Sequence, residues 1–320
     1  MRDVRGYSKP NTCGLKSHTP KLIRTRVGDV EAAVFGNPTG PALILLPHGL
    51  GDWSSLLNIA LDLAILMPDL RLVALSRPGC GGTPSVKEGA ADPLRSEAST
   101  TLPALMDALD ISAAHLVGHA DGASVALIFA GLFPHRALGV VGLAPYCFAD
   151  DYLRTTLEAM PSRAEGPHSL SNFPYIGDPD IRFLRWREDR LWECKTRWNA
   201  TKFLDGISMP VTLVQGARDE FISLDQAAAI GARIQGDVCW ITLQNAGHFV
   251  HIDNPQQIVM LVQRQLKQAC RATFPSAMVA DDGMCRPNWS RKVSEAVRVR
   301  VPDPQPLVIQ DERPTSLLLV

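Results

Sequence analysis

The chain has 320 residues, 46% of them hydrophobic, and a formal net charge of −1 at pH 7. This is enough apolar material to fill the core of one large domain, or of a domain with an insertion. The balanced charge creates no basic field that would attract nucleic acid or an anionic membrane, so we expect a small molecule as the partner.

The N-terminal residues, MRDVRGYSKPNTCG, contain no apolar run that could serve as a secretory signal. The longest apolar runs of the chain are too short, or too broken by proline, to span a bilayer. We therefore expect a cytoplasmic protein without a membrane span.

Strand-like and helix-like segments alternate from about residue 20 to residue 270, which is typical of an α/β fold with a largely parallel sheet. The run ALILLPHG, at 42–49, is apolar throughout and ends in a turn, as expected of a strand buried on both faces. Further strands are predicted at residues 30–36, 70–79, 114–118, 137–145 and 210–216, and a last strand with its exit loop at 237–248.

Three helices are predicted where apolar residues recur at helical spacing. Asn254 and Pro255 suit the N-cap and the first position of the last of these helices. The expected buried stripes are Leu56, Ala60, Leu63 and Met67 in helix 53–67; Leu102, Leu105, Met106 and Leu109 in helix 101–111; and Ile258, Val262 and Leu266 after residue 255.

The segment AHLVGHADGASVAL, at 114–127, has the pattern of a strand, a sharp turn and a helix that enzymes use to display a nucleophile. Such a turn needs small residues two positions before and after its apex, because the helix packs closely on the strand. Gly118 and Gly122 meet this need. The apex itself is Ala120, so a methyl group stands where a nucleophile is expected.

Two loops after later strands supply an acid and a base. Asp219 lies in GARDEFIS and His248 in NAGHFVHIDNP, and open α/β sheets build their sites in such loops. Glu220 stays open as the alternative acid. Upstream, the turn in LPHGLGDW offers the backbone N–H of Leu50, which we expect to pair with that of Asp121 as an oxyanion hole.

Four landmarks coincide in order and spacing: the turn in LPHGLGDW, the segment SRPGCGGT after the next strand, the sharp turn at Ala120, and the Asp219/His248 pair. Over residues 22–270 the chain resembles the α/β-hydrolase family. This resemblance implies a three-layer α/β-hydrolase fold, in which a mostly parallel, eight-stranded central sheet has helices on both sides and carries a helical cap after its sixth strand. It also implies Ser-His-Asp hydrolysis of an ester or related bond in a small organic molecule.

The segment between the strands near 145 and 210 differs in texture, since it contains IRFLRWREDRLWECKTRW, which is rich in Arg and Trp. The sequence beyond about 273 lacks helical periodicity and is dense in proline and charge. We predict a core at 20–146 and 206–272, a helical cap at 147–205, and a loosely ordered C-terminal tail at 273–320.

The predicted cap has two candidate roles in binding. Its tryptophans either form an apolar wall over the site or anchor the segment to the core, and its arginines either meet a substrate carboxylate or cover a solvated helix face. The residues concerned are Trp186, Trp192, Trp198, Arg182, Arg185 and Arg187.

Without an Oγ at Ala120 no acyl-enzyme can form, and loss of the nucleophile costs on the order of 10⁶ in turnover. Three interpretations stay open: an engineered hydrolase variant, a natural enzyme whose Asp219/His248 dyad acts as a general base, and a ligand-binding protein without chemistry. We favour the hydrolase scaffold, because the acid, the histidine and the oxyanion turn are all retained. A shifted register with Asp121 as nucleophile would place His119 where a small residue is needed.

The remaining candidate residues receive structural interpretations. His119 and His251 are expected to be structural, and Asp121 is expected to lie in the first turn of a helix. The seven cysteines are scattered without a Cys-x-x-Cys pair, and there is no Gly-x-Gly-x-x-Gly or P-loop motif. The sequence therefore predicts no metal and no cofactor.

Overall fold

A computed structural model describes residues 19–85, 92–160 and 179–273 of the chain. Its centre is an eight-stranded sheet with the order β1-β2-β4-β3-β5-β6-β7-β8. Strands β3 to β8 are mutually parallel, whereas β2 runs antiparallel to both β1 and β4. The strands are β1 (Lys21–Thr25), β2 (Gly28–Gly36), β3 (Ala42–Leu46), β4 (Arg71–Leu75), β5 (Ala114–His119), β6 (Ala137–Leu143), β7 (Val211–Gly216) and β8 (Val238–Leu243).

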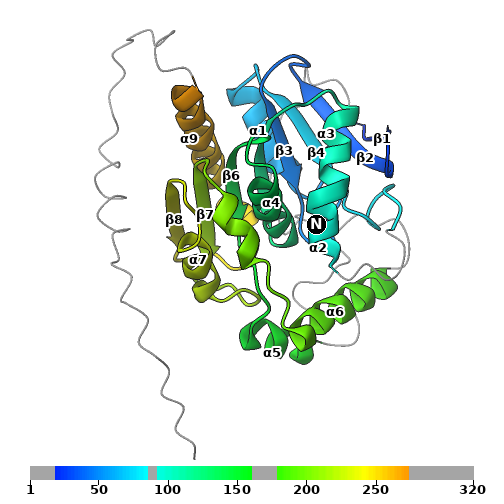
Figure 1. The fold of residues 1–320 in the computed structure, drawn as a ribbon, viewed down its shortest axis with the longest axis vertical. Helices are drawn as coiled ribbons and strands as arrows, with labels where there is room; N and C mark the ends of the chain where they lie inside the picture. The colour runs from blue at the N-terminus through cyan, green and yellow to red at the C-terminus, as the bar shows by residue number, and fades with distance from the viewer. Residues whose placement is uncertain (1–18, 86–91, 161–178, 274–320) are drawn as a thin grey trace, which may run out of the picture. The chain divides into compact units, whose positions relative to one another are not determined.

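Helices cover both faces of this sheet, which confirms the predicted three-layer α/β fold (Figure 1). The residues of the predicted apolar stripes are buried or partly buried. The helices are α1 (Leu57–Leu66), α2 (Pro93–Ser96), α3 (Leu102–Ala108), α4 (Asp121–Leu132), α5 (Asp151–Ala159), α6 (Pro179–Thr196), α7 (Leu224–Gly231), α8 (Val250–Asp253) and α9 (Pro255–Thr273).

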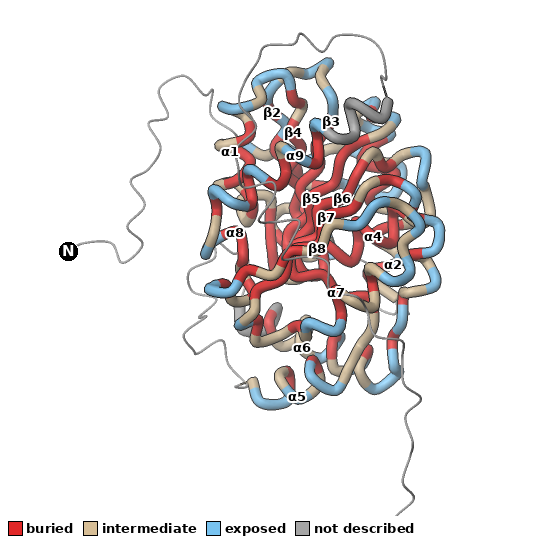
Figure 2. Tube along the Cα trace, turned by 90° about the vertical axis from the view of Figure 1, so that its left-hand side faces the viewer, coloured by how far each residue is buried: buried red, intermediate tan, exposed pale blue. Residues whose placement is uncertain are grey.

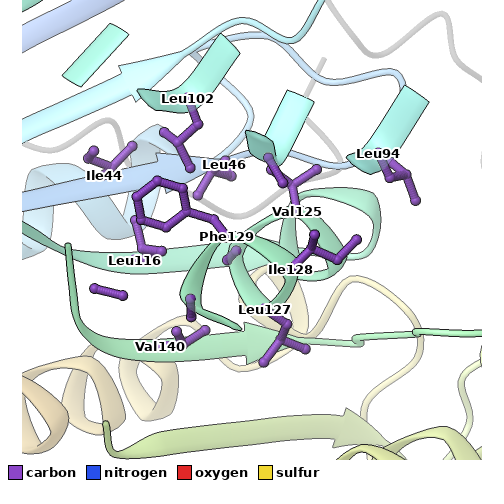
Figure 3. Packing of buried hydrophobic residues seen from close by; sticks show 14 of the residues in the cluster. Ile44, Leu46, Leu94, Leu102, Leu116, Val125, Leu127, Ile128, Phe129 and Val140 are labelled. Carbon is purple, nitrogen blue, oxygen red and sulfur yellow. The ribbon is translucent and has the colours of Figure 1, made fainter. Parts of the chain in front are cut away.

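The strands that carry the site are buried on both faces. Along β3, Ile44 and Leu46 belong to one apolar cluster, whereas Leu43 and Leu45 belong to another on the opposite face. The first cluster packs against α3 and α4, and Phe129 of α4 lies among strand residues there (Figure 3). The second packs against α1 and α9. Figure 2 shows β5, β6 and β7 as a continuous buried band. The ends of these strands are therefore held rigidly.

Strand β1 was not predicted from the sequence. Its five residues, KLIRT, are exposed or half-buried, so they carry no apolar alternation. The strand exists because its backbone pairs with β2 at the edge of the sheet. Edge strands of this kind depend on partner hydrogen bonds, which a single sequence does not reveal.

A π turn, Glu97–Thr101, joins α2 to α3. The N–H of Leu102 donates to the Glu97 carbonyl, five residues earlier. Pro103 follows at once, and in a regular α-helix its ring would collide with the carbonyl of Ser99. The wider turn accommodates the proline and sets Glu97 in a buried position.

The chain between β6 and β7 contains α5, α6 and a 3₁₀ turn, Thr201–Gly206. Both helices lie beyond the same end of the sheet (Figure 1). The predicted C-terminal tail lies outside the described residues except for residue 273. Within the described residues, no helix is long and apolar enough to cross a membrane.

Candidate active site

The link between β5 and α4 is the sharp turn that the sequence predicts. Ala120 has φ 50° and ψ −115°, a conformation that non-glycine residues adopt only under strain. A Cβ on Gly118 would lie 2.3 Å from the carbonyl oxygen of Gly122, and one on Gly122 would lie 2.2 Å from that of Leu46. Both glycines are therefore required by close backbone contact. The residue with the strained backbone is Ala120 and not Asp121, as predicted from the positions of Gly118 and Gly122.

Asp219 and His248 are brought together by the loops after β7 and β8. His248 Nδ1 lies 3.1 Å from each carboxylate oxygen of Asp219. The carboxylate is fixed in turn, because it accepts hydrogen bonds from the backbone N–H groups of Phe221 and Ile222 at 2.9 Å and from Gln215 Nε2 at 2.6 Å. The acid is thus oriented before any ligand arrives.

Asp219 changes the pKa of the His248 ring. Burial by itself lowers the pKa of His248, but the charge of Asp219 and its hydrogen bond outweigh burial, so the pKa is raised. Glu220, the alternative acid, accepts instead from the backbone N–H of His248, at 3.3 Å. With Nδ1 paired to Asp219, Nε2 is the nitrogen that remains for a ligand.

The turn after β3 lies beside the start of α4. The N–H of Leu50 points to His48 Nδ1 at 3.4 Å, a long hydrogen bond within the turn. Asp121 is the first residue of α4, so its N–H has no acceptor inside the helix. A Cβ on Gly49 would lie 2.5 Å from Asp121 Oδ2 and 2.1 Å from Trp186 Nε1, so α6 packs directly on this turn.

A buried group of charged side chains surrounds Asp121, and we call it the ion network. Arg77 Nη1 lies 2.8 Å from Asp121 Oδ2, and Arg77 Nη2 lies 2.7 Å from Glu97 Oε2. Arg190 of α6 donates to Asp121 at 3.3 Å and to the Tyr146 hydroxyl at 2.6 Å. The network therefore ties α6 to the first residue of α4.

The network is completed by two more contacts. Tyr146 donates to Asp121 Oδ1 at 2.8 Å, and Glu193 Oε1 lies 2.8 Å from Arg190 Nη2. Burial would raise the pKa of Asp121, but Arg190 and Arg77 outweigh it and hold the pKa well below its usual range. The carboxylate of Asp121 is therefore an ionised structural partner. Sequence analysis missed this network.

Aromatic rings pack on the other side of the site, and we give the name histidine cluster to His48, His119, His251 and Phe249. The ring centroid of His119 lies 4.9 Å from that of His248 and 4.7 Å from that of His251. His48 and Phe249 pack against His119 at 5.6 and 5.1 Å. His119 Nε2 also forms a hydrogen bond with the carbonyl oxygen of His248, and the structural roles expected of His119 and His251 stay predictions.

The other predicted cap residues divide between two roles. Trp198 is buried beside Tyr146, with ring centroids 5.7 Å apart, whereas Trp192 is 59% exposed. Arg187 Nε donates to the carbonyl of Leu157 in α5, and Arg185 is exposed. The side chain of Arg182 lies outside the described residues. Of the three tryptophans, Trp186 alone is seen to contact the turn after β3.

A metal site needs several His, Cys, Asp or Glu side chains close together. Among the described residues, no group of three or more His, Cys, Asp or Glu side chains is arranged to hold one. Of the cysteines in this part of the chain, none forms a disulfide: Cys80, Cys147, Cys194 and Cys239.

Comparison with known proteins gives one family and many related folds. A family model described as "Alpha/beta hydrolase family" matches residues 43–261. A curated relative, the dihydrolipoyllysine-residue acetyltransferase component of an acetoin cleaving system from Pseudomonas putida, is 28% identical over 247 residues. That match covers 70% of this chain and 63% of the relative, so the chain spans less than two thirds of the relative's length.

Solved structures resemble the chain at low sequence identity. A membrane phospholipase A has a TM-score of 0.65 at 17% identity, covering 79% of this chain and 86% of that one. A 2-hydroxy-6-oxo-6-phenylhexa-2,4-dienoate hydrolase from Rhodococcus has a TM-score of 0.59 at 17% identity, with coverage of 78% and 99%. A carboxylesterase from Bacillus subtilis has a TM-score of 0.57 at 21% identity, with coverage of 78% and 91%. At these identities the likeness concerns the fold alone.

Proposed function

We propose, on the premise that the chain belongs to the alpha/beta hydrolase family, that its site binds a small carbonyl compound beside Ala120. In this proposal the site keeps the acid and the base of an ester-hydrolysing triad and lacks the nucleophile. Helices α5 and α6 act as the cap over the bound molecule. The chain as it stands then binds the compound without forming an acyl-enzyme.

One observation carries the proposal: a strained Ala120 at the β5–α4 turn, together with an assembled Asp219–His248 pair. Backbone strain of this kind costs free energy, is held in place by the surrounding structure and clusters at active sites. The orientation of Asp219 by three hydrogen bonds gives further support, because a site without chemistry has no physical need for it.

The decisive experiment is Ala120→Ser, assayed with p-nitrophenyl acetate. In this variant Ser Oγ forms a bond to the carbonyl carbon while its proton passes to His248 Nε2, and the carbonyl π electrons move onto the oxygen. Collapse expels p-nitrophenolate, and water then releases acetate from the acyl-enzyme. We expect a burst of p-nitrophenolate and covalent labelling by a serine-directed phosphonate.

The matched control is Ala120→Ser combined with His248→Ala, which keeps the hydroxyl and removes the base. We expect this double variant to lose both the burst and the turnover. A folded Ala120→Ser protein with no burst and no phosphonate label would contradict the proposal and favour a ligand-binding protein.

A second function, general-base catalysis without a nucleophile, is favoured by one observation: the raised pKa of His248 beside Asp219. A base with a pKa near the working pH transfers protons effectively. The test is exchange of the α-hydrogens of acetone in D₂O by the unchanged protein. The exchange rate should rise as His248 loses its proton, and His248→Ala should abolish it. Exchange that survives His248→Ala would remove this candidate.

A further inference from the structure

Helix α6 carries polar residues on a buried face. Trp186, Arg190 and Glu193 follow at spacings of four and three residues, so they lie on one side of the helix. Arg190 and Glu193 are each only 4% exposed. Trp186 Nε1 and Arg190 Nε are buried N–H donors without an acceptor. Buried donors in native proteins nearly always have partners, so these groups indicate an acceptor that the protein alone does not supply.

Trp186 is the donor that lies beside the turn after β3. Its Nε1 packs against Gly49, beside Asp121 Oδ2, as the distances from a Cβ on Gly49 require. The neighbouring Leu50 N–H, expected as an oxyanion donor, points to His48 Nδ1. The turn after β3 therefore has one backbone N–H engaged within the protein and an indole N–H beside it that is not engaged.

We propose that the indole N–H of Trp186 binds an acceptor oxygen of the ligand, the carbonyl oxygen of a neutral ketone or ester lying over Ala120. The identity of this oxygen rests on the proposed function. A neutral ligand fits better than a carboxylate, because Arg77 and Arg190 are already paired with carboxylates. Trp186 is then a cap residue that touches the reacting oxygen.

The first experiment compares Trp186→Phe with Trp192→Phe, both in the Ala120→Ser protein with p-nitrophenyl acetate. Phenylalanine keeps an aromatic ring and removes only the indole N–H. Loss of one oxyanion donor lowers kcat about 10²-fold. We expect that fall for Trp186→Phe, with little change in KM, and no change for the exposed Trp192→Phe. Equal kcat values for the two variants would overturn the proposal.

The second experiment uses the unchanged protein and follows its indole N–H groups by NMR. Acetophenone and a panel of small ketones and esters are titrated, with ethylbenzene as the control that lacks the oxygen. A downfield shift of the Trp186 indole proton with a ketone or ester, and none with ethylbenzene, supports the proposal. A Trp186 resonance that no member of the panel moves overturns it.

The two proposals fail in different ways. If Ala120→Ser is an esterase and Trp186→Phe has no effect on it, the proposed function stands and the role of Trp186 is wrong. If Ala120→Ser is inactive while a ketone shifts the Trp186 proton, the oxygen-binding role of Trp186 stands and the proposed function is wrong.

Discussion

The two sides of the site at Ala120 are buried to a similar degree but use opposite chemistry. In the histidine cluster burial, the largest cause, lowers the pKa of His48 and of His251 to about 3, so these two rings are neutral at pH 7. The ion network keeps Arg77 and Asp121 charged, because their opposite charges compensate each other. Ala120 therefore lies between two highly organised surroundings. Each side should therefore respond to a different perturbation.

The largest effect that we expect is a loss of stability at low pH, which comes from the histidine cluster. His48, His119 and His251 have lowered folded-state pKa values, against about 6.5 in the unfolded chain. Below pH 6.5 the unfolded chain takes up protons that the folded protein refuses, so stability is lost as the pH falls. By pH 4.5 the loss is about 2–3 kcal/mol for each of His48 and His251, which together is a large part of the stability of a domain, and His119 adds a loss in the same direction. Urea denaturation between pH 7.5 and 4.5 measures it.

The control for this prediction is His135→Gln at an exposed position, which should leave the pH dependence unchanged.

In the ion network, burial raises the pKa of Glu193 to about 8, so the contribution of Glu193 to stability is present below about pH 4.5 and is lost as the pH rises toward 8. Glu193→Gln should remove this loss of stability between pH 4.5 and 8 and leave the effect of the histidines in place. For the histidine cluster, a free energy of unfolding that stays constant between pH 6.5 and 5 would contradict neutral rings.

The acid of the pair can be identified in the Ala120→Ser protein. Asp219→Asn removes the charge that orients His248, and such a change lowers kcat about 10⁴-fold. Glu220→Gln is the matched control, since Glu220 accepts a hydrogen bond from the backbone N–H of His248 whereas Asp219 pairs with the ring, so this change should lower kcat much less. Steady-state kinetics with p-nitrophenyl acetate measure both. Equal losses would mean that Glu220 shares the role.

The ion network should be broken by Arg77→Met, which leaves Glu97 and Asp121 buried without this cation. Breaking a buried pair costs about 3–5 kcal/mol of unfolding free energy. The matched control is Arg233→Met, whose partner Asp205 is 51% exposed and where the loss should stay below about 1 kcal/mol. Chemical denaturation distinguishes the two. Similar losses for both variants would show that the network contributes no more than a surface pair.

The smallest effect is expected at the apex of the turn. Ala120→Gly relieves a strained conformation worth about 1–3 kcal/mol, while glycine adds about 0.5–1 kcal/mol of backbone entropy cost. The variant should be more stable by about 1 kcal/mol. Ala123→Gly, inside α4, should be less stable by about 1 kcal/mol or more. Thermal unfolding of both variants measures the difference, and a loss in Ala120→Gly would mean that the apex is unstrained.

The sequence predicted the parts of the fold and site that depend on local pattern. Buried strands, periodic helices and the small residues around Ala120 each leave a signal within a few positions. Asp219 and His248 were found because each follows a strand. The structure was needed to give the distance between Asp219 and His248. It was also needed to show that Asp219, and not Glu220, pairs with the His248 ring.

The ion network was missed because its members come from separate segments. Arg77 follows β4, Glu97 lies in the π turn and Arg190 lies in α6. One signal was present: Arg190 shares the helical spacing of Phe183 and Trp186, so charge falls on an otherwise apolar stripe. A charge at such a position indicates a buried partner, which a single sequence cannot identify.

The π turn at Glu97–Thr101 also determines how this region tolerates changes in length. A π turn holds one residue more than an α turn, so removing one residue there and replacing Pro103 by alanine closes the helix into regular α form. The rest of the helix would keep its packing, but the Glu97 side chain would rotate away from Arg77 by about 100°. In relatives with a single-residue gap at this point, we expect the arginine after β4 to be replaced as well.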